Sequence, residues 1–409
     1  MPVFDRREFL VQSAGALTAV AILPEFARGS PALRAPLNVG VIGLGRQGRA
    51  IIAELQKQEG VKIAAVCDND ASRLDLGVKR AQGAAGFATH AELIEKAKGV
   101  TACIIATPTH LHKQVAVDLL GAGKHVYCEA PLAHTIDDSK AILAAAASSQ
   151  SVFQPGLEGR CNPIYKLART FFLSDSVRDL VSMRAQCHQK TSWRVPANDP
   201  AREKALNWRL DDSVTLGLPG EWGTHQFDVF CWYRGEYPVS IRTTGGVFFH
   251  KDGRTIADSI ACELTWADKR AAQYEATLAN SYQGRHELFH GSNAAIKLAW
   301  THGWMFKEAD APTQGWEVYA NRQQFHNDEG ITLIANATKL AEQGKLKDGV
   351  GMPQTPLYYA LEAFVQTVAN GGKHQATAED GHRATVLGIL AQRSLIEGKE
   401  VAVEKDMMG

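Results

Sequence analysis

The chain has 409 residues, of which 45% are hydrophobic and 22% charged, a composition typical of a folded globular protein and not of a disordered or fibrous one. The 44 Lys and Arg residues balance the 44 Asp and Glu residues, which excludes the basic excess of a nucleic-acid-binding or polybasic membrane-surface protein. At roughly 150 residues per domain, this length allows two to three domains with large cores.

The first thirty residues are typical of a targeting signal. Arg6 and Arg7 precede the apolar run from Val11 to Leu23, a pattern that resembles a twin-arginine export signal. Because the run is shorter than the ~20 residues that span a bilayer, we expect no stable membrane insertion. The alternative is an amphipathic helix of the mature protein. The cleavage site is weakly marked, with Ser30-Pro31-Ala32 as the best match.

This interpretation assigns residues 1–32 to a signal peptide and predicts a periplasmic or otherwise exported protein that engages the twin-arginine export machinery. That route is known for carrying folded proteins, often with a cofactor already loaded. The leader therefore also favours a nucleotide that stays tightly bound.

A nucleotide-binding pattern follows the leader. The apolar strand Leu37–Ile42 leads into a glycine-rich turn and a helical pattern, and glycines at this spacing bring a helix N-terminus close to a pyrophosphate. The next strand, Val61–Cys67, ends in Asp68, which can accept hydrogen bonds from both ribose hydroxyls and would repel a 2′-phosphate. The pattern predicts NAD, with NADP less favoured. The alternative for Asp68 alone is a helix N-cap.

Strands and helices continue to alternate up to residue 155. The expected elements are a strand at Thr101–Ala106, a helix at Thr109–Ala122, a strand at His125–Cys128, a helix capped by Thr135 and a strand at Val152–Pro155. This alternation predicts an α/β fold with a doubly wound parallel sheet over residues 33–155. Ligands bind beyond the carboxyl ends of such strands.

The segments Ala106–His112 and Gly121–Leu132 resemble the glucose–fructose oxidoreductase / inositol dehydrogenase family. The resemblance extends from Leu37 to about Gly398. It implies an N-terminal Rossmann domain and a C-terminal α/β domain, here 156–409 with the C-terminal helices, built on a mostly antiparallel open sheet. That sheet often forms the oligomer interface, so a homodimer or homotetramer is expected. Family members mostly oxidise or reduce a hydroxyl or carbonyl of a sugar or cyclitol with NAD(P).

The candidate cofactor-binding residues are Gly43, Gly45, Arg46, Gln47, Gly48, Asp68, Thr107, Pro108, His112 and Glu129. One position departs from the family. The motif after the fifth strand is normally Glu-Lys-Pro, with the lysine contacting the reacting hydroxyl, whereas this chain has Glu129-Ala130-Pro131. Glu129 keeps its implied place near the nicotinamide ribose, but an alanine can neither donate a hydrogen bond nor carry a charge.

The catalytic candidates are Glu221 and His225, which stand at i and i+4, and Asp228 follows at i+7. One helix would place all three on one face. From spacing alone, a structural histidine is the favoured interpretation. The family resemblance implies instead that His225 takes the hydroxyl proton, with Glu221 raising its basicity. Asp228 is either a substrate contact or an internal structural acid.

Substitutes for the missing lysine come from the second domain. Arg160 is the favoured donor to substrate, and Lys190 is a further candidate, although a lysine on an outer sheet face is more often solvated. Trp193 and Trp208 lie in the polar stretch from Thr191 to Leu218, which we expect to be a long loop or cap. Their rings suit the apolar faces of a sugar, or else anchor the loop.

The remaining pattern predicts antiparallel strands between Ser240 and His290, further strands at Ala294–Trp300 and Trp316–Asn321, a polar interface arm at Gly303–Pro353, and a helix capped by Thr377. No metal-ligand spacing is legible in the cysteines or histidines, so no metal is expected.

The favoured function is an exported NAD(P)-dependent oxidoreductase acting on a hydroxyl or carbonyl of a sugar, glycoside or cyclitol, with His225 as the acid/base. A second hypothesis is a glycoside-cleaving enzyme that oxidises transiently and retains its cofactor. A third is a non-catalytic nucleotide- or sugar-binding relative that lost its chemistry with the lysine.

Overall fold

The computed structural model describes residues 31–314, 317, 320, 322–325, 328–334 and 351–409. The leader, apart from Pro31 and Ala32, and most of the expected strand at Trp316–Asn321 lie outside the described residues. The chain divides into two compact units. The larger unit comprises residues 32–162, 182–288 and 354–409, and the smaller comprises the described parts of 163–181 and 289–353. The domain boundaries expected from the sequence stay a prediction.

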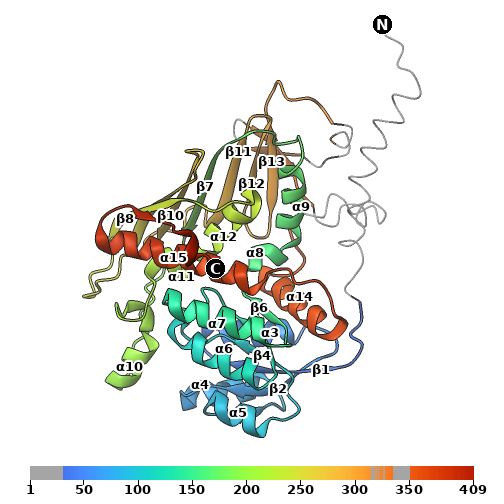
Figure 1. Cartoon of the computed structure of the whole chain (residues 1–409), viewed down its shortest axis with the longest axis vertical. Helices are drawn as coiled ribbons and strands as arrows, with labels where there is room; N and C mark the ends of the chain where they lie inside the picture. Colours follow the sequence, from blue (N-terminus) through green and yellow to red (C-terminus); the bar gives the residue numbers. More distant parts are fainter. Residues whose placement is uncertain (1–30, 315–316, 318–319, 321, 326–327, 335–350) are drawn as a thin grey trace. The chain divides into compact units, whose positions relative to one another are not determined.

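The first sheet is six-stranded, and its order β3-β2-β1-β4-β5-β6 is that of the Rossmann fold (Figure 1). All neighbouring strands run parallel. The strands are β1 (Leu37–Ile42), β2 (Val61–Cys67), β3 (Ala85–Phe87), β4 (Ala102–Ile105), β5 (His125–Cys128) and β6 (Phe153–Pro155). The helices between them are α3 (Arg46–Leu55), α4 (Ala71–Arg80), α5 (His90–Lys96), α6 (His112–Gly121) and α7 (Ile136–Ser148). The doubly wound parallel sheet predicted from the sequence is confirmed.

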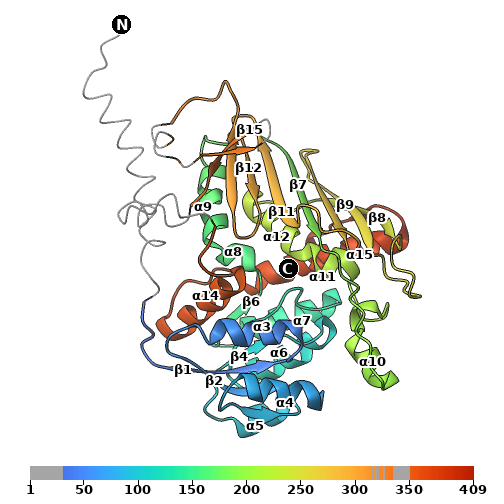
Figure 2. The same cartoon turned by 180° about the vertical axis from the view of Figure 1, so that it is seen from behind.

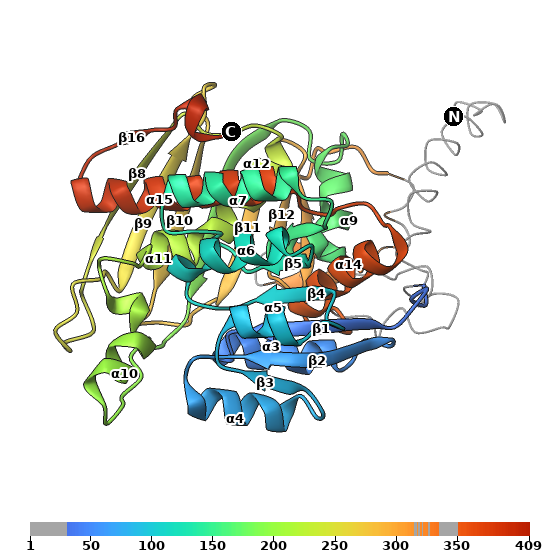
Figure 3. The same cartoon turned by 60° about the horizontal axis from the view of Figure 1, so that its bottom comes forward.

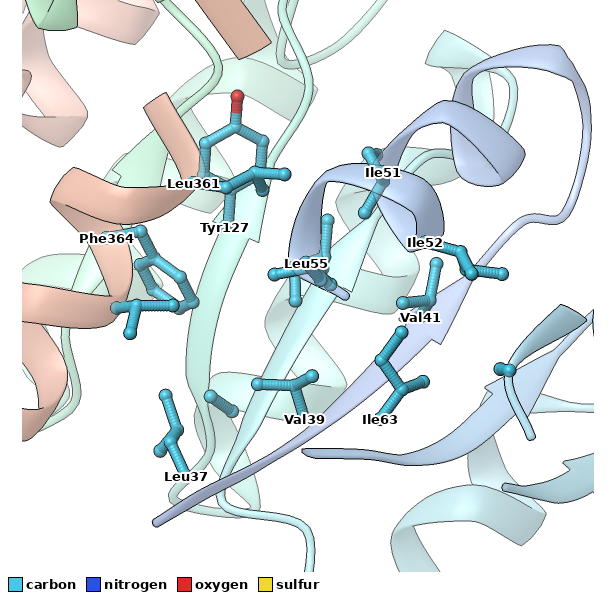
Figure 4. Packing of buried hydrophobic residues seen from close by; sticks show 14 of the residues in the cluster. Leu37, Val39, Val41, Ile51, Ile52, Leu55, Ile63, Tyr127, Leu361 and Phe364 are labelled. Carbon is cyan, nitrogen blue, oxygen red and sulfur yellow. The ribbon is translucent and has the colours of Figure 1, made fainter. Parts of the chain in front are cut away.

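Both faces of this sheet are buried, as a parallel sheet requires. On one face, Val39 and Val41 of β1 pack with α3 and with Leu361 and Phe364 of α14 (Pro356–Asn370), as Figure 4 shows. On the other face the core is built from α5, α6 and α7. A helix that begins about two hundred residues beyond β6 therefore completes the Rossmann core.

The second sheet has ten strands in the order β14-β15-β13-β12-β11-β7-β10-β9-β8-β16. Most neighbouring strands of this sheet pair antiparallel, whereas β7 and β10 run parallel. This confirms the mostly antiparallel open sheet. Its strands are β7 (Leu180–His188), β8 (Ser240–Gly246), β9 (Ser259–Thr265), β10 (Ala271–Thr277), β11 (Arg285–Gly291), β12 (Ala294–Leu298), β13 (Gly303–Lys307), β14 (Arg322–Phe325), β15 (Asp328–Thr332) and β16 (Val401–Ala402).

Strands β8, β9 and β10 alternate between buried and exposed side chains. Their buried face meets α11 (Gly217–Glu221), α12 (Gly223–Arg234) and α15 (Ala378–Glu397), and α15 also runs beside α7 (Figure 3). The expected capping box begins α15: Asp380 N–H donates to Thr377 Oγ1 and Thr377 N–H to Asp380 Oδ2. The opposite face of these strands is polar and exposed, and the oligomer expected to use it stays a prediction.

The remaining helices are α8 (Glu158–Cys161) and α10 (Pro200–Leu206) in the larger unit and α9 (Pro163–Phe172) in the smaller. Helix α10 lies inside the stretch expected to be a long loop, and Figure 2 shows it extending away from α11. None of the helices in the described ranges is long and apolar enough to cross a membrane.

Candidate active site

The turn after β1 leaves no room for side chains at two glycines. Gly43 has φ +91°, and a Cβ there would lie 2.5 Å from the Ala106 carbonyl oxygen. A Cβ on Gly48 would lie 1.8 Å from the Gly43 carbonyl oxygen. At Gly45, by contrast, the nearest atom to a Cβ is Arg73 Nη1 at 3.6 Å, so this side of the turn is more open. The turn thus leads into the N-terminus of α3 as a pyrophosphate site requires.

The carboxylate of Asp68 holds this turn from the end of β2. Its Oδ2 accepts the Leu44 N–H at 2.7 Å and its Oδ1 accepts the Asp70 N–H at 2.8 Å. Each oxygen retains a further lone pair for a ribose hydroxyl. Asp70 caps α4 by accepting the Arg73 N–H at 3.0 Å, and it also pairs with Arg202 of α10. These residues fit the adenosine half of NAD.

His112 joins the loops that follow β4 and β5. Its Nε2 lies 2.9 Å from the Thr107 carbonyl oxygen and its Nδ1 lies 3.0 Å from the Pro131 carbonyl oxygen. Burial lowers the pKa of His112 to about 4, although both carbonyls oppose the shift. Since both ring nitrogens face the backbone, His112 positions Thr107 and Pro108 and has no ring nitrogen left for the cofactor contact we expected. Thr107 Oγ1 is buried without a hydrogen-bond partner among the described residues.

Glu129 lies at the carboxyl end of β5, where the nicotinamide half of NAD would be held. Gln47 Nε2 donates to its Oε1 at 3.1 Å. Burial, followed by the charge of Glu158, raises the pKa of Glu129 to about 8, while the Gln47 hydrogen bond opposes that shift. Near neutral pH the carboxyl group is therefore largely protonated and can donate a hydrogen bond to a ribose oxygen.

Ala130 turns its methyl group towards an apolar cluster. It is half-buried against Leu157, Ala376 and Ala384, and the Ala130–Pro131 peptide bond is cis. No side chain at this position supplies the cation of the family motif.

Glu221, His225 and Asp228 do not share one helix, contrary to the expectation from their spacing. Helix α11 ends at Glu221, and α12 begins only after Trp222, which has φ −112° and ψ −44°. The two carboxylates meet different partners. Glu221 Oε2 accepts from Thr109 Oγ1 at 3.2 Å and lies 3.7 Å from Arg209 Nε.

Asp228 is held by Arg160, which is therefore not a free donor to substrate as we expected. The Arg160 Nε lies 3.0 Å from both Asp228 oxygens, and its Nη2 lies 2.8 Å from Oδ1. Its Nη1 lies 3.0 Å from Asp380 Oδ2. Burial disfavours the charged guanidinium, but Asp228 outweighs it and raises the pKa of Arg160. The bidentate geometry identifies a buried ion pair that joins α8, α12 and α15.

His225 is a neutral imidazole at physiological pH. Burial, with the positive charge of Arg285 second, lowers its pKa to about 3. The increase in basicity expected from Glu221 is not found, because the charged group that acts on His225 is Arg285. A neutral ring still offers one nitrogen as a proton acceptor.

The two tryptophans singled out in the sequence meet at Arg209. The guanidinium carbon lies 4.3 Å from the centre of the Trp208 ring and 5.9 Å from that of Trp193. Trp208 also lies edge-on to His110 at 6.0 Å. Both tryptophans are half-exposed, which leaves ring surface for a sugar. Lys190 lies elsewhere, exposed beside Phe249 with its Nζ 5.6 Å from the ring centre.

Sequence reasoning gave no role to several residues of this site: Thr109, Glu158, Arg202 and Arg285. Their positions carry no motif, because each enters the site through tertiary contacts. Arg209 had a signal in the sequence, since it lies with Trp193 and Trp208 in a stretch where aromatic rings alternate with Arg and Asn. No group of His, Cys, Asp and Glu suited to a metal occurs within the described part of the chain.

The strand order, the glycine turn and the acid after β2 define a Rossmann-type NAD(H)-binding oxidoreductase. The model described as "Oxidoreductase family, NAD-binding Rossmann fold" matches residues 37–157, and that of the family's C-terminal alpha/beta domain matches residues 185–403. The chain belongs to the glucose–fructose oxidoreductase / inositol dehydrogenase family of oxidoreductases.

Three known proteins illustrate the similarity. A levoglucosan dehydrogenase of Pseudarthrobacter phenanthrenivorans is 33% identical over 312 residues, 69% of this chain and 75% of the relative. A 2,7-anhydro-N-acetylneuraminate hydratase of Mediterraneibacter gnavus is 21% identical over 369 residues, 88% of this chain and 92% of the relative. A solved levoglucosan dehydrogenase in complex with NADH and levoglucosan has the same fold, with a TM-score of 0.70, 20% identity, and coverage of 90% of this chain and 100% of that chain.

The buried histidines make stability depend on pH. A histidine in the unfolded chain has a pKa of about 6.5, whereas His225 and His112 have values of about 3 and about 4 in the folded protein. The unfolded state therefore binds more protons below about pH 6.5, and stability falls as the pH decreases towards 4, by up to about 1.4 kcal/mol per pH unit for each histidine.

We expect His225→Asn to remove the part of the pH dependence of stability that comes from His225. Urea unfolding at about pH 7 and about pH 5 should show a smaller loss of stability in the variant than in the wild type. An equal loss in both proteins would mean that His225 is not a buried neutral histidine.

Proposed function

We propose that this protein oxidises a hydroxyl of a sugar, or reduces the corresponding carbonyl, with NAD(H), and that His225 exchanges the hydroxyl proton. One observation carries this proposal. The stack of Trp193, Arg209 and Trp208 is linked through Glu221 to Thr109, which follows the carboxyl end of β4. Ligands of doubly wound sheets bind at this edge. Tryptophan rings beside an arginine and a carboxylate suit the apolar faces and hydroxyl edges of a sugar.

NAD, when bound, supplies a hydride acceptor for the carbinol carbon. The chain's own residues do the rest. Asp68 and the turn around Gly45 hold the adenosine and pyrophosphate, and the protonated Glu129 donates to the nicotinamide ribose. His225, neutral at the working pH, accepts the hydroxyl proton, a contribution of typically 10²–10⁴-fold to the rate.

Levoglucosan is the first substrate to test, since a levoglucosan dehydrogenase is among the relatives. We expect purified protein supplied with NAD and levoglucosan, or other sugars, to raise the absorbance of the reduced cofactor. His225→Ala should lower turnover by at least ~10²-fold while NAD still binds. The exposed His374→Ala is the control and should leave the rate unchanged. A His225→Ala enzyme with wild-type turnover would refute the assigned role.

We further propose that the protein retains its cofactor. The segment 191–216 is tied to the cofactor half through Arg202 and Asp70, two residues beyond Asp68, and through Arg209 and Glu221. Within the segment, Asn207 bonds both backbone groups of Val195 at 2.7 and 2.8 Å. These contacts support a strap that slows the exit of a bound dinucleotide.

Arg202→Ala should speed the release of bound NADH by about two- to fivefold, because one exposed ion pair is lost. The measurement is the decay of bound-cofactor fluorescence after dilution into excess NAD. Lys204→Ala, on the same helix, should release NADH at the wild-type rate. An unchanged rate in Arg202→Ala would show that the strap does not limit exit.

A second candidate is a cleavage reaction with transient oxidation and no net reduction of cofactor. It is favoured by the proposed retention of NAD and by the existence of a relative that is named a hydratase. Release of an aglycone from an aryl glycoside without a lasting absorbance change at the reduced-cofactor band would favour this reaction. If NAD stays bound but neither cofactor reduction nor aglycone release is detected, the non-catalytic hypothesis is favoured.

We also propose export through the twin-arginine pathway, on the strength of Arg6, Arg7 and the apolar run that follows. In a bacterial host, replacing both arginines by lysine should leave the protein in the cytoplasm, as fractionation and immunoblotting would show. A periplasmic protein that lacks both arginines would contradict the proposal.

A further inference from the structure

The loss of the family lysine leaves a chemical requirement unmet in the proposed reaction. As a hydroxyl gives up its proton, negative charge develops on its oxygen, and a fixed donor or cation at that oxygen lowers the barrier. Ala130 faces Leu157, Ala376 and Ala384 and supplies neither. The donor must therefore come from another part of the site.

Arg160 is not available as this donor. Four of its contacts, at 2.8–3.0 Å, go to Asp228 and Asp380, and its side chain is only 9% exposed. Arg254 is committed in the same way, to Asp252 and to the backbone of Ser192. Turning the Arg160 guanidinium to a substrate would leave Asp228 without its cation, and the Arg254 side chain is fully buried.

Arg209 differs from both. Its side chain is 44% exposed, and its one carboxylate neighbour, Glu221, lies 3.7 Å from Nε, which is beyond hydrogen-bond length. No hydrogen bond from this guanidinium occurs among the described residues. The group is nevertheless positioned, because the Trp208 and Trp193 rings lie 4.3 and 5.9 Å from its central carbon. Its donors are thus oriented and uncommitted.

Contacts through Glu221 link Arg209 to the loop that follows β4. The partial burial of its guanidinium lowers the pKa of Arg209, the Glu221 carboxylate opposes that shift, and the charge of Arg46 in the glycine-rich turn adds to it. Glu221 is in turn bonded to Thr109, two residues beyond Thr107. Its second oxygen, Oε1, is buried and has no hydrogen-bond partner in the described ranges. A cation and a carboxylate oxygen are therefore both available where a sugar would lie between the tryptophans and the turn.

We propose that Arg209 takes the place of the lysine missing at position 130: its guanidinium donates to the oxygen of the reacting sugar hydroxyl, and Glu221 holds it there. The proposal rests on the proposed sugar oxidoreductase function. In the step, the O–H proton would pass to His225, the carbinol hydrogen would leave with both C–H electrons as a hydride to NAD, and the C–O single bond would become a carbonyl. The sugar is oxidised and the nicotinamide is reduced.

An arginine can supply the positive charge of the lysine but not its ability to transfer a proton. Because a guanidinium keeps its proton at all working pH values, Arg209 stabilises charge but cannot relay a proton. The proton transfer is left to His225. Arg209 is therefore not a general acid. The property to test is the positive charge of its side chain, not its ability to transfer a proton.

The test compares Arg209→Met and Arg209→Lys with the wild type. Arg209→Met should lower kcat on levoglucosan, or on the sugar that the wild type oxidises, by about 10²–10³-fold, as the loss of one donor to a developing oxyanion does. Arg209→Lys keeps the charge and should recover at least tenfold of this loss. Arg322→Met is the control, since Arg322 is also 44% exposed and paired with one carboxylate, and it should behave as the wild type.

A second measurement does not depend on turnover. Calorimetric titration of levoglucosan into protein loaded with NADH, which cannot accept a hydride, should show about tenfold or weaker binding in Arg209→Met, because a charged hydrogen bond is lost. The amount of NADH released on denaturation should equal that of the wild type. If Arg209→Met also loses its NADH, the proposal is overturned, because the residue then supports the cofactor site and not the sugar.

The two proposals fail separately. A wild type that binds levoglucosan but neither oxidises nor cleaves any sugar would refute the proposed function, while weaker sugar binding in Arg209→Met would still support the assignment of Arg209. Wild-type sugar affinity and wild-type kcat in Arg209→Met would overturn the assignment and leave the proposed function standing.

Discussion

The carbonyl oxygen of Gly43 occupies the space that a Cβ on residue 48 would need, at 1.8 Å, and the remainder of the site depends on this close approach. It lets α3 begin directly beyond β1, so that the N-terminus of the helix faces the cofactor site. It also fixes the peptide of Leu44, whose N–H reaches Asp68. Any side chain at residue 48 would separate the turn from the helix and remove both effects.

The second half of the site is attached to this turn by polar contacts. Gln47 reaches Glu129 at the end of β5, and His112 joins the loops after β4 and β5. The pair of Glu221 and Thr109 then brings α11 to the same edge. Burial determines the protonation states of the titratable groups in this region. Glu129 is largely protonated, which suits a donor to ribose. His225 is neutral and can accept a proton, and burial lowers its basicity.

Two arginines show how tertiary contacts assign different roles to the same residue type. Arg160 lies between two carboxylates of α12 and α15, so that its charge is neutralised and its donors are used inside the core. Arg209 lies on the segment between β7 and α11, stacked on tryptophan, with much of its surface exposed. In the sequence Arg160 looked like the substrate donor because it lies within a segment that resembles the family, residues 154–163. Arg209 lies in a polar stretch that only its tryptophans mark as a sugar contact.

The sequence alone determined the features that depend on local geometry. These are the strand, turn and helix around Gly43, the acid at residue 68, the capping box at Thr377 and the alternation that predicts a parallel sheet, since each is set by the conformational demands of residues close together in the chain. Tertiary structure decided the rest. Glu221 lies beside Arg209 whereas Asp228 pairs with Arg160, and α14 packs into the Rossmann core from about 200 residues further along the chain. Burial and the charge of Arg285 lower the pKa of His225, which its spacing from Glu221 had seemed to raise. Such properties depend on which side chains meet across the fold, and a linear pattern does not contain that information.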